Sequence, residues 1–287
     1  MTVKPVWIAL VLGAAVWGCQ KETGGTTSPQ PALAGLRYFD AVLDTGYMDF
    51  RVVDIVEFAP NANQAQFRSG GNPEGVTNGF LTPPYQPVLA GAHDVRVFLN
   101  GLSLATDTTQ MFDTTITFKQ GWNYTFILYG SARAKALHSM VFADTAMALP
   151  ADNGVWVRTV NLALDTTGVG PSVDMFATNY HNTPAGTPTS SATTYAKSTA
   201  YVRVPVDSLA AEITRTGTLT PVVASGNFPF GIVGTSSSNP IAGSIVKNTA
   251  FTIVVLPRST PGAGMPNAYA NPGVFVLVDQ QPPLTAP

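Results

Sequence analysis

Short runs of strand-forming residues separated by turns limit this chain to a β fold more than any other feature. Valine, isoleucine, phenylalanine, tyrosine and threonine fill these runs, and glycine, asparagine or aspartate bounds most of them: 49–58, 94–101, 114–121 and 123–130. In the second run Val95, Val97 and Leu99 occupy alternate positions, as in a strand with one buried face. Residues 206–213 are the one segment in which we expect a helical turn. The regular spacing predicts an all-β fold of antiparallel β-sandwiches.

The composition of the 287 residues supports this interpretation. The 26 glycines and 23 prolines favour turns over long helices, and the hydrophobic share of 45% is enough for an extensive core. The net charge of −2 provides no basic surface for phosphate groups, so we expect no nucleic acid partner.

The N-terminus has the features of an export signal. A positively charged start precedes an apolar run at 5–18 that is too short to span a bilayer comfortably, and this run ends in Val-Trp-Gly-Cys. That ending resembles the lipobox of bacterial lipoproteins. The resemblance implies that the Cys19 thiol receives lipid, that the signal peptide, residues 1–18, is then removed, and that the new N-terminus is acylated. An ordinary signal peptide with an incidental cysteine is the alternative. Residues 19–34 begin with this cysteine and have the composition of a flexible linker. We therefore expect the lipid at Cys19 to attach the protein to the cell envelope, at the outer membrane.

Three segments of the first half recur in the second half in the same order. The pairs are 36–52 with 157–177, 94–108 with 201–215, and 116–130 with 243–257. A duplicated domain explains the shared order better than chance similarity among strands. We therefore expect two tandem sandwich domains, at 35–150 and 151–287, that fold independently. Long polar loops are expected at 67–84 and 179–194.

Two Asp-Thr sequences raise the question of acid protease chemistry. An aspartic protease needs two carboxylates within hydrogen-bond reach that share one proton. Asp44 is followed by Thr-Gly-Tyr, without the hydroxyl residue usual after such a triplet, and Asp165 is followed by Thr-Thr, without the glycine of the tight turn. We therefore expect no catalysis from Asp44 or Asp165 and interpret both as residues that cap turns between strands.

The same residues carry a family resemblance. Two segments resemble the opening pattern of the bacterial domain-of-unknown-function 4397 family: "LRYFDAVLDTGYMDFRV" and "VRTVNLALDTTGVGPSVDMFA". The matching residues are Arg37, Asp40, Asp44 and Asp49 in the first segment and Arg158, Asn161, Asp165 and Asp174 in the second. "LAGAHDVRVFLNG" (89–101) is similar to a later strand of the family, although the Ser-Pro turn of the family is absent. The resemblance implies an exported protein with Ig-like β folds and no established enzymatic activity. It names no ligand.

Other residue groups do not point to chemistry. The histidines His93, His138 and His181 lack neighbours at metal-ligand spacing, and Asp107 and Asp113 lack the loop pattern of a calcium site. We therefore expect no cofactor, no metal and no catalytic residue; a weak calcium site built from strand-turn aspartates stays open as an alternative.

Aromatic residues gather in the run 123–130 and next to it. Tyr124 and Phe126 share one face of a strand and Tyr129 lies on the other, which favours core filling over a binding platform. Trp122 and Trp156 have the same interpretation.

These features together predict a lipid-anchored cell-envelope protein that acts as a non-enzymatic binding or structural module. Its partner would be the membrane, through the lipid at Cys19, and an envelope protein or a glycan. Two alternatives stay open: a carbohydrate-binding module, and a hydrolase with a site in the loops 67–84 or 179–194.

Overall fold

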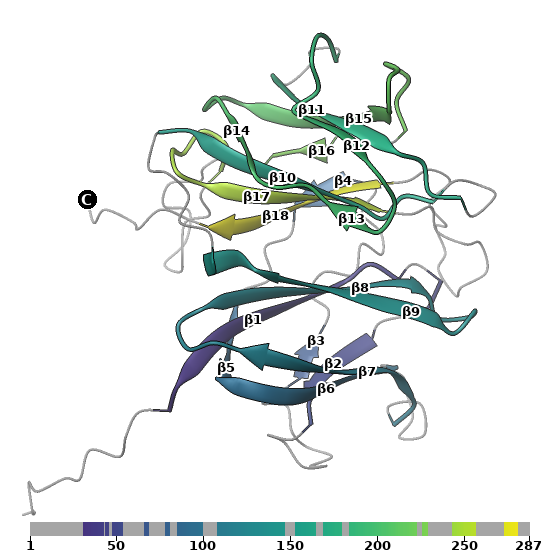
Figure 1. Ribbon diagram of the computed structural model, residues 1–287, viewed down its shortest axis with the longest axis vertical. Coiled ribbons are helices and arrows are strands. Elements are labelled where there is room, and N and C mark those ends of the chain that lie inside the picture. Colours follow the sequence, from purple (N-terminus) through teal and green to yellow (C-terminus); the bar gives the residue numbers. More distant parts are fainter. Residues whose placement is uncertain are drawn as a thin grey trace, which may run out of the picture. The chain divides into compact units, whose positions relative to one another are not determined.

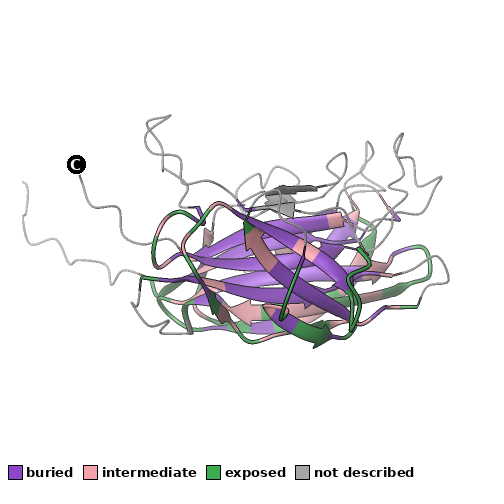
Figure 2. Cartoon of the chain, turned by 90° about the horizontal axis from the view of Figure 1, so that it is seen from above, coloured by how far each residue is buried: buried purple, intermediate pink, exposed green. Residues whose placement is uncertain are grey.

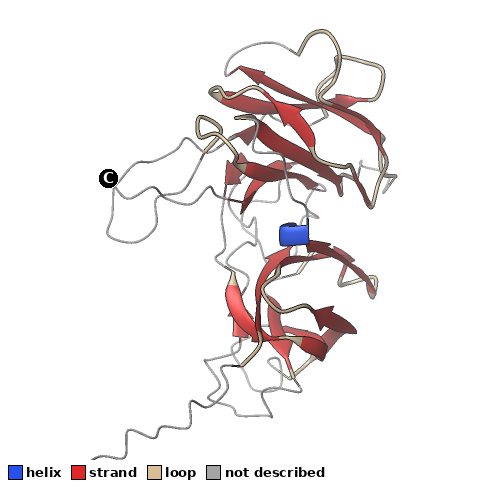
Figure 3. Cartoon of the chain, turned by 60° about the vertical axis from the view of Figure 1, so that its left-hand side comes forward, coloured by secondary structure: helices blue, strands red, loops and turns tan. Residues whose placement is uncertain are grey.

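In the computed structural model, residues Leu33–Pro287 form one compact unit. The structure describes residues 31–42, 44–45, 48–53, 66–68, 78–80, 85–99, 108–146, 153–164, 169–179, 184–222, 226–228, 243–256 and 273–280. These residues form strands, turns and a short 3-10 helix at Asp144–Ala146, which is blue in Figure 3, so the all-β prediction is confirmed. No helix in this part of the chain has the length and apolar composition needed to cross a membrane.

The first sandwich consists of two four-stranded sheets (Figure 1). Sheet A has the order β5 (Gln86–Leu89), β1 (Leu33–Asp40), β8 (Asn123–Ser131) and β9 (Ala136–Ala143). Sheet B has the order β3 (Gln66–Arg68), β2 (Met48–Val52), β6 (Gly91–Leu99) and β7 (Gln110–Phe118). The two sheets enclose a core that includes Leu36, Phe50, Val97 and Phe126.

The second sandwich consists of a six-stranded sheet and a four-stranded sheet. Sheet C has the order β13 (Lys197–Ser198), β10 (Val155–Asn161), β17 (Ala250–Leu256), β18 (Gly273–Gln280) and β4 (Asn78–Phe80), and β14 (Val202–Val204) also pairs with β10. Sheet D has the order β12 (Ser190–Thr193), β11 (Val173–Asn179), β15 (Leu209–Arg215) and β16 (Gly226–Asn227). Val157, Met175, Ile213 and Phe251 belong to the core between them.

Most residues of the central strands of sheets A and C are buried, on both faces of each sheet. Figure 2 shows buried residues in purple. In β8 the side chains of Phe126 and Leu128 lie in the core of the first sandwich, whereas Ile127 and Tyr129 lie in a different core. All residues of β17 are buried. Continuous apolar sequence in these strands therefore reflects burial on both sides of a sheet rather than one.

A third apolar core joins the two sandwiches. It contains Phe39 and Ile127 from sheet A and Val160, Val254 and Phe275 from sheet C, and the rings of Phe39 and Phe275 lie 5.2 Å apart. In addition, β4 comes from the first half of the chain but pairs with β18 of sheet C. The domain boundaries and the independent folding of the halves stay predictions, but sheet C is not built from residues 151–287 alone.

Most strands lie near their predicted places. The runs 94–101, 114–121 and 123–130 overlap β6, β7 and β8. The run 49–58 overlaps β2, although its residues 54–58 lie outside the described part of the chain. The segments expected to be loops include strands: 67–84 contains β4, and 179–194 contains β12.

Two expectations about these elements are wrong. Sheets A and C are mixed rather than antiparallel, because β1 pairs in parallel with β8 and β10 pairs in parallel with β17. Parallel pairing needs a long connection, and the chain between the two strands of each pair includes strands of the opposite sheet. Residues 206–213 contribute to strand β15 instead of a helical turn, because Leu209, Ala211 and Ile213 alternate into the core at strand spacing.

Candidate functional site

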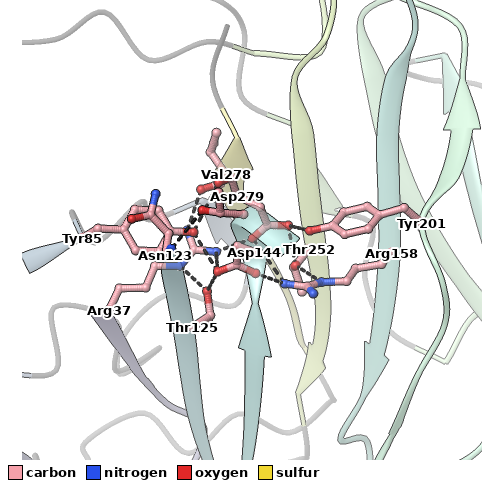
Figure 4. A network of polar contacts seen from close by, with 11 residues as sticks. Arg37, Tyr85, Asn123, Thr125, Asp144, Arg158, Tyr201, Thr252, Val278 and Asp279 are labelled. Atoms are coloured by element: carbon pink, nitrogen blue, oxygen red, sulfur yellow. Dashed lines mark hydrogen bonds and ion pairs between the residues drawn. The ribbon is translucent and has the colours of Figure 1, made fainter. Parts of the chain in front are cut away.

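The most unusual feature of the structure is a group of charged side chains buried where the two sandwiches meet (Figure 4). Arg37 on β1 is fully buried and lies opposite Thr125 of β8 in the sheet register. Its guanidinium donates to Thr125 Oγ1 at 2.7 Å, to the Val278 carbonyl at 2.5 Å and to the Asp279 carboxylate. The guanidinium also lies 4.7 Å from the centre of the Tyr85 ring. Arg37 therefore connects sheet A directly to β18 of sheet C.

Arg158 on β10 has the corresponding surroundings in the second sandwich. It lies opposite Thr252 of β17, and its Nε donates to Thr252 Oγ1 at 2.6 Å. Its Nη2 donates to Asp144 Oδ1 at 2.5 Å, and its guanidinium lies 4.8 Å from the centre of the Tyr201 ring. Because Asp144 begins the 3-10 helix that follows β9, Arg158 connects sheet C back to the end of sheet A.

The two aspartates complete a reciprocal arrangement. Asp144 accepts hydrogen bonds from Thr125 and, at 2.8 Å, from Tyr85 in its own sandwich. Asp279 accepts hydrogen bonds from Thr252 at 2.5 Å and from Tyr201 at 2.6 Å in its own sandwich. Each carboxylate also accepts from the arginine of the other sandwich. The arginine of its own sandwich is more distant, at 3.9 Å for Arg37–Asp144 and 3.7 Å for Arg158–Asp279.

Burial and the neighbouring charges set the protonation of this network. Burial raises the pKa of Asp144, and the negative charge of Asp279 acts in the same direction, while Arg37 and Arg158 oppose them. Burial disfavours the charged form of Arg37, but the negative groups around it more than compensate and raise its pKa. Burial raises the pKa of Tyr85 and of Tyr201, so both phenols remain hydrogen-bond donors at neutral pH.

The network holds two positive and two negative side chains, and their charges balance. Its carboxylates are already bonded to arginine, threonine and tyrosine donors, and all four charged side chains are at most 5% exposed. Charges enclosed and satisfied in this way position the elements that carry them. The arrangement is therefore suited to holding the two sandwiches in one relative placement.

Asp44 caps a turn, as predicted, but the turn belongs to a distant hairpin. Its carboxylate accepts from Ser131 Oγ at 2.5 Å and from the backbone amides of Ala132 at 2.9 Å and Arg133 at 3.2 Å. These residues form the turn between β8 and β9. The carboxylate thus joins the segment between β1 and β2 to that hairpin. Asp165, its predicted counterpart, lies outside the described residues.

The other residues of the family pattern also make structural hydrogen bonds. Asp40 accepts from the Val42 amide at 2.9 Å, and Asn161 accepts from the Ala163 amide at 3.0 Å. Asp174 accepts from the amides of Ala192 and Gly217. Asp49 is buried beside Arg51, with their charged groups 3.5 Å apart. The pattern therefore marks residues that hold strand ends and turns.

The remaining sequence candidates are dispersed. His93 stacks on Phe118 in sheet B, and His138 lies on β9 beside Tyr129. Asp113 is exposed on β7. Within the described ranges, no three histidine, cysteine, aspartate or glutamate side chains are grouped to hold a metal ion. Cys19, Asp107 and His181 lie outside those ranges.

The aromatic residues pack as predicted. Tyr124 and Phe126 are buried in the core of the first sandwich, where Trp122 packs against them. Tyr129 lies on the opposite face in the third core. Trp156 on β10 is half-buried.

The sequence analysis named the two arginines of the network only as residues of the family pattern, and it did not name the acidic and aromatic members or predict a network. Asp279 follows the apolar run 274–278, and Arg37 lies between Leu36 and Tyr38. The sequence signal for these residues was a single charge inside or beside an apolar strand. Such a charge is buried only with a partner, so each one indicates a buried polar contact.

One comparison with known proteins bears on this geometry. Residues 34–174 match the model of a family described as Domain of unknown function (DUF4397). The matched segment runs from β1 into β11, contains both arginines and extends past the boundary expected at residue 150. No curated protein matches the chain. Over residues 34–174, the chain is therefore similar to the DUF4397 family, which confirms the predicted resemblance. The match is one segment, and the presence of two copies stays a prediction.

Proposed function

We propose that the protein is a lipid-anchored envelope module in which two copies of one sandwich domain are joined into a single rigid body. The duplication is supported by matching strand pairs: β1 pairs with β8 as β10 pairs with β17, and each pair places an arginine opposite a threonine. Each sandwich then contributes one arginine, threonine, tyrosine and aspartate to the buried network.

The reciprocal network is the observation that carries this proposal. Two sandwiches connected by a mobile hinge would not need buried charges that are satisfied only across their contact. A rigid body serves a binding or structural role, because its surfaces keep fixed positions relative to one another. In this proposal the network supports those surfaces and takes no part in chemistry, and the protein is not an enzyme.

The anchor follows from the N-terminal sequence. The lipobox-like ending places lipid on Cys19, and the first strand begins at Leu33, which leaves a short polar linker between membrane and sandwich. Several acyl chains, each contributing about 0.8 kcal/mol per buried methylene, would hold the protein stably at a membrane of the cell envelope. We propose the outer membrane.

Metabolic labelling tests the anchor. Cells that express the full chain receive radiolabelled palmitate, and we expect label in the wild type and in Ser28→Ala, a control substitution in the linker. Cys19→Ser should remain unlabelled and appear in the soluble fraction. Equal labelling of Cys19→Ser would refute the anchor. Hydrolysis of chromogenic ester, glycoside or peptide substrates by the purified protein would refute the non-enzymatic role.

A further inference from the structure

Strand β9 is the outer strand of sheet A among the described residues. It is only partly covered, and its Val141 side chain is 42% exposed. Its sequence, Ala-Leu-His-Ser-Met-Val-Phe-Ala, contains no lysine, arginine, aspartate, glutamate, glycine or proline. An outer strand presents unpaired backbone groups to any added strand, and natural proteins usually protect such an edge with charges or proline. β9 lacks that protection.

The outer strand of the opposite sheet shows the contrast. β7 has a similar length, but it carries the exposed carboxylate of Asp113 near its middle. A charge at this place disfavours the addition of another strand. Of the two long outer strands of the first sandwich, β9 is therefore the one suited to accept a strand.

The second sandwich shows what covers the corresponding edge. The registers Thr125 opposite Phe142 and Thr252 opposite Leu277 place Val141 of β9 at the position that Val276 has in β18. In β18 this edge is covered by β4, which pairs in parallel and places Phe80 opposite Val276. Val276 is fully buried, whereas Val141 is exposed. One edge thus has an added strand, and its counterpart presents the same kind of apolar residue to solvent.

We infer that the edge of β9 binds an extended segment of a partner polypeptide, which adds to sheet A as a parallel strand. The segment would be uncharged where it lies against residues 139–141 and would place an apolar side chain opposite Val141. Backbone hydrogen bonds would supply affinity and the contact with Val141 would supply selectivity, as in other cases of strand addition. The inference deepens the proposed role as a binding module, and it does not depend on lipidation of Cys19.

A peptide with the sequence of residues 75–82, Gly-Val-Thr-Asn-Gly-Phe-Leu-Thr, provides the probe because it contains β4. Binding of the fluorescein-labelled peptide to the full chain is followed by fluorescence anisotropy, and hydrogen exchange locates the protected amides. We expect saturable binding with protection in residues 136–143. A proline in place of the asparagine of the peptide should abolish binding, because proline cannot donate a backbone hydrogen bond.

Two variants of the protein complete the test. Val141→Lys should weaken binding at least about tenfold, equivalent to about 1.4 kcal/mol, and Val141→Ser should weaken it less. Ile245→Lys, at a residue that is 46% exposed, is the matched control and should bind like the wild type. Absence of saturable binding at millimolar peptide would overturn the inference, as would protection of residues 273–280 instead. If the chain self-associates and Val141→Lys abolishes this self-association, the edge binds a second copy of the chain. That result would also overturn the inference. Cys19→Ser should leave this assay unchanged, so failure of the strand addition is distinguishable from failure of the anchor.

Discussion

Replacement of Arg37 by methionine tests the buried network most directly. Methionine fills a similar volume but supplies no charge and no donor. The substitution removes the donor to Thr125, to the Val278 carbonyl and to Asp279, so a carboxylate and a carbonyl in a fully buried site lose a partner. The two carboxylates then share a single arginine, Arg158.

The expected magnitude follows from this loss. Breaking a buried ion pair by removing one partner costs about 3–5 kcal/mol, most of it from the charge left unpaired. For a folded unit of this size, each kcal/mol lowers the melting temperature by about 2–4 °C, so we expect a decrease on the order of 6–20 °C. Neutralising the unpaired group should recover part of the loss. The double variant Arg37→Met with Asp279→Asn should therefore cost about 0.5–3 kcal/mol less than the sum of the single variants.

Urea unfolding followed by circular dichroism gives the four free energies needed. Arg96→Met is the matched control, because Arg96 and Asp94 are 3.3 Å apart but their side chains are 34% and 45% exposed. An exposed pair of this kind contributes about 0–1 kcal/mol. The reasoning is refuted if Arg37→Met lowers the free energy of unfolding no more than Arg96→Met does. It is also refuted if the losses of the two single variants sum to the loss of the double variant, because the network would then not stabilise the contact between the sandwiches.

Two further predictions concern single carboxylates. Asp44→Ala should lower the free energy of unfolding by about 1–3 kcal/mol, because the turn between β8 and β9 loses its acceptor. In the same urea titrations, Asp113→Ala on the surface should change it by less than about 0.5 kcal/mol. Burial raises the pKa of Asp144 in the folded state above its usual 3.8. The protonated carboxyl therefore contributes to stability below pH 3.8, and this contribution is lost as the pH rises through the folded-state pKa. The stability of the wild type relative to Asp144→Asn should therefore decrease as the pH rises from about 3.8, and an increase over the same titration would contradict this sign.

The fold could be predicted from sequence to the level of sandwiches because local patterns determine strands. The alternation of Val95, Val97 and Leu99 indicated β6, and the placement of Tyr124, Phe126 and Tyr129 on two faces of β8 followed from the period of two. The parallel pairs could not be predicted, because pairing between distant strands depends on how the whole chain returns to a sheet. The addition of β4 to sheet C was unpredictable for the same reason.

The candidate site could be predicted only in part. Arg37 and Arg158 stood out only as matching positions at the start of two similar segments, and their role in a buried network was not predicted. Their carboxylate partners were not found, because each arginine bonds the aspartate of the other sandwich, and no local spacing relates Arg37 to Asp279 or Arg158 to Asp144. Asp44 was correctly interpreted as a turn residue, but its hydrogen bonds to Ser131 and Ala132 depend on tertiary structure.

The network also explains why two similar sandwiches keep one arrangement. The apolar core between sheets A and C is attractive but non-directional, so it alone would tolerate sliding or rotation of one sheet on the other. The guanidinium groups need acceptors in fixed directions, and a small shift would leave four buried charges unpaired. Because each sandwich contributes the same four side-chain types, the contact has the reciprocity of an interface between identical protomers, in which one residue pair occurs twice about an axis. Within the compact unit Leu33–Pro287, these reciprocal hydrogen bonds therefore give the contact a direction that its apolar core lacks.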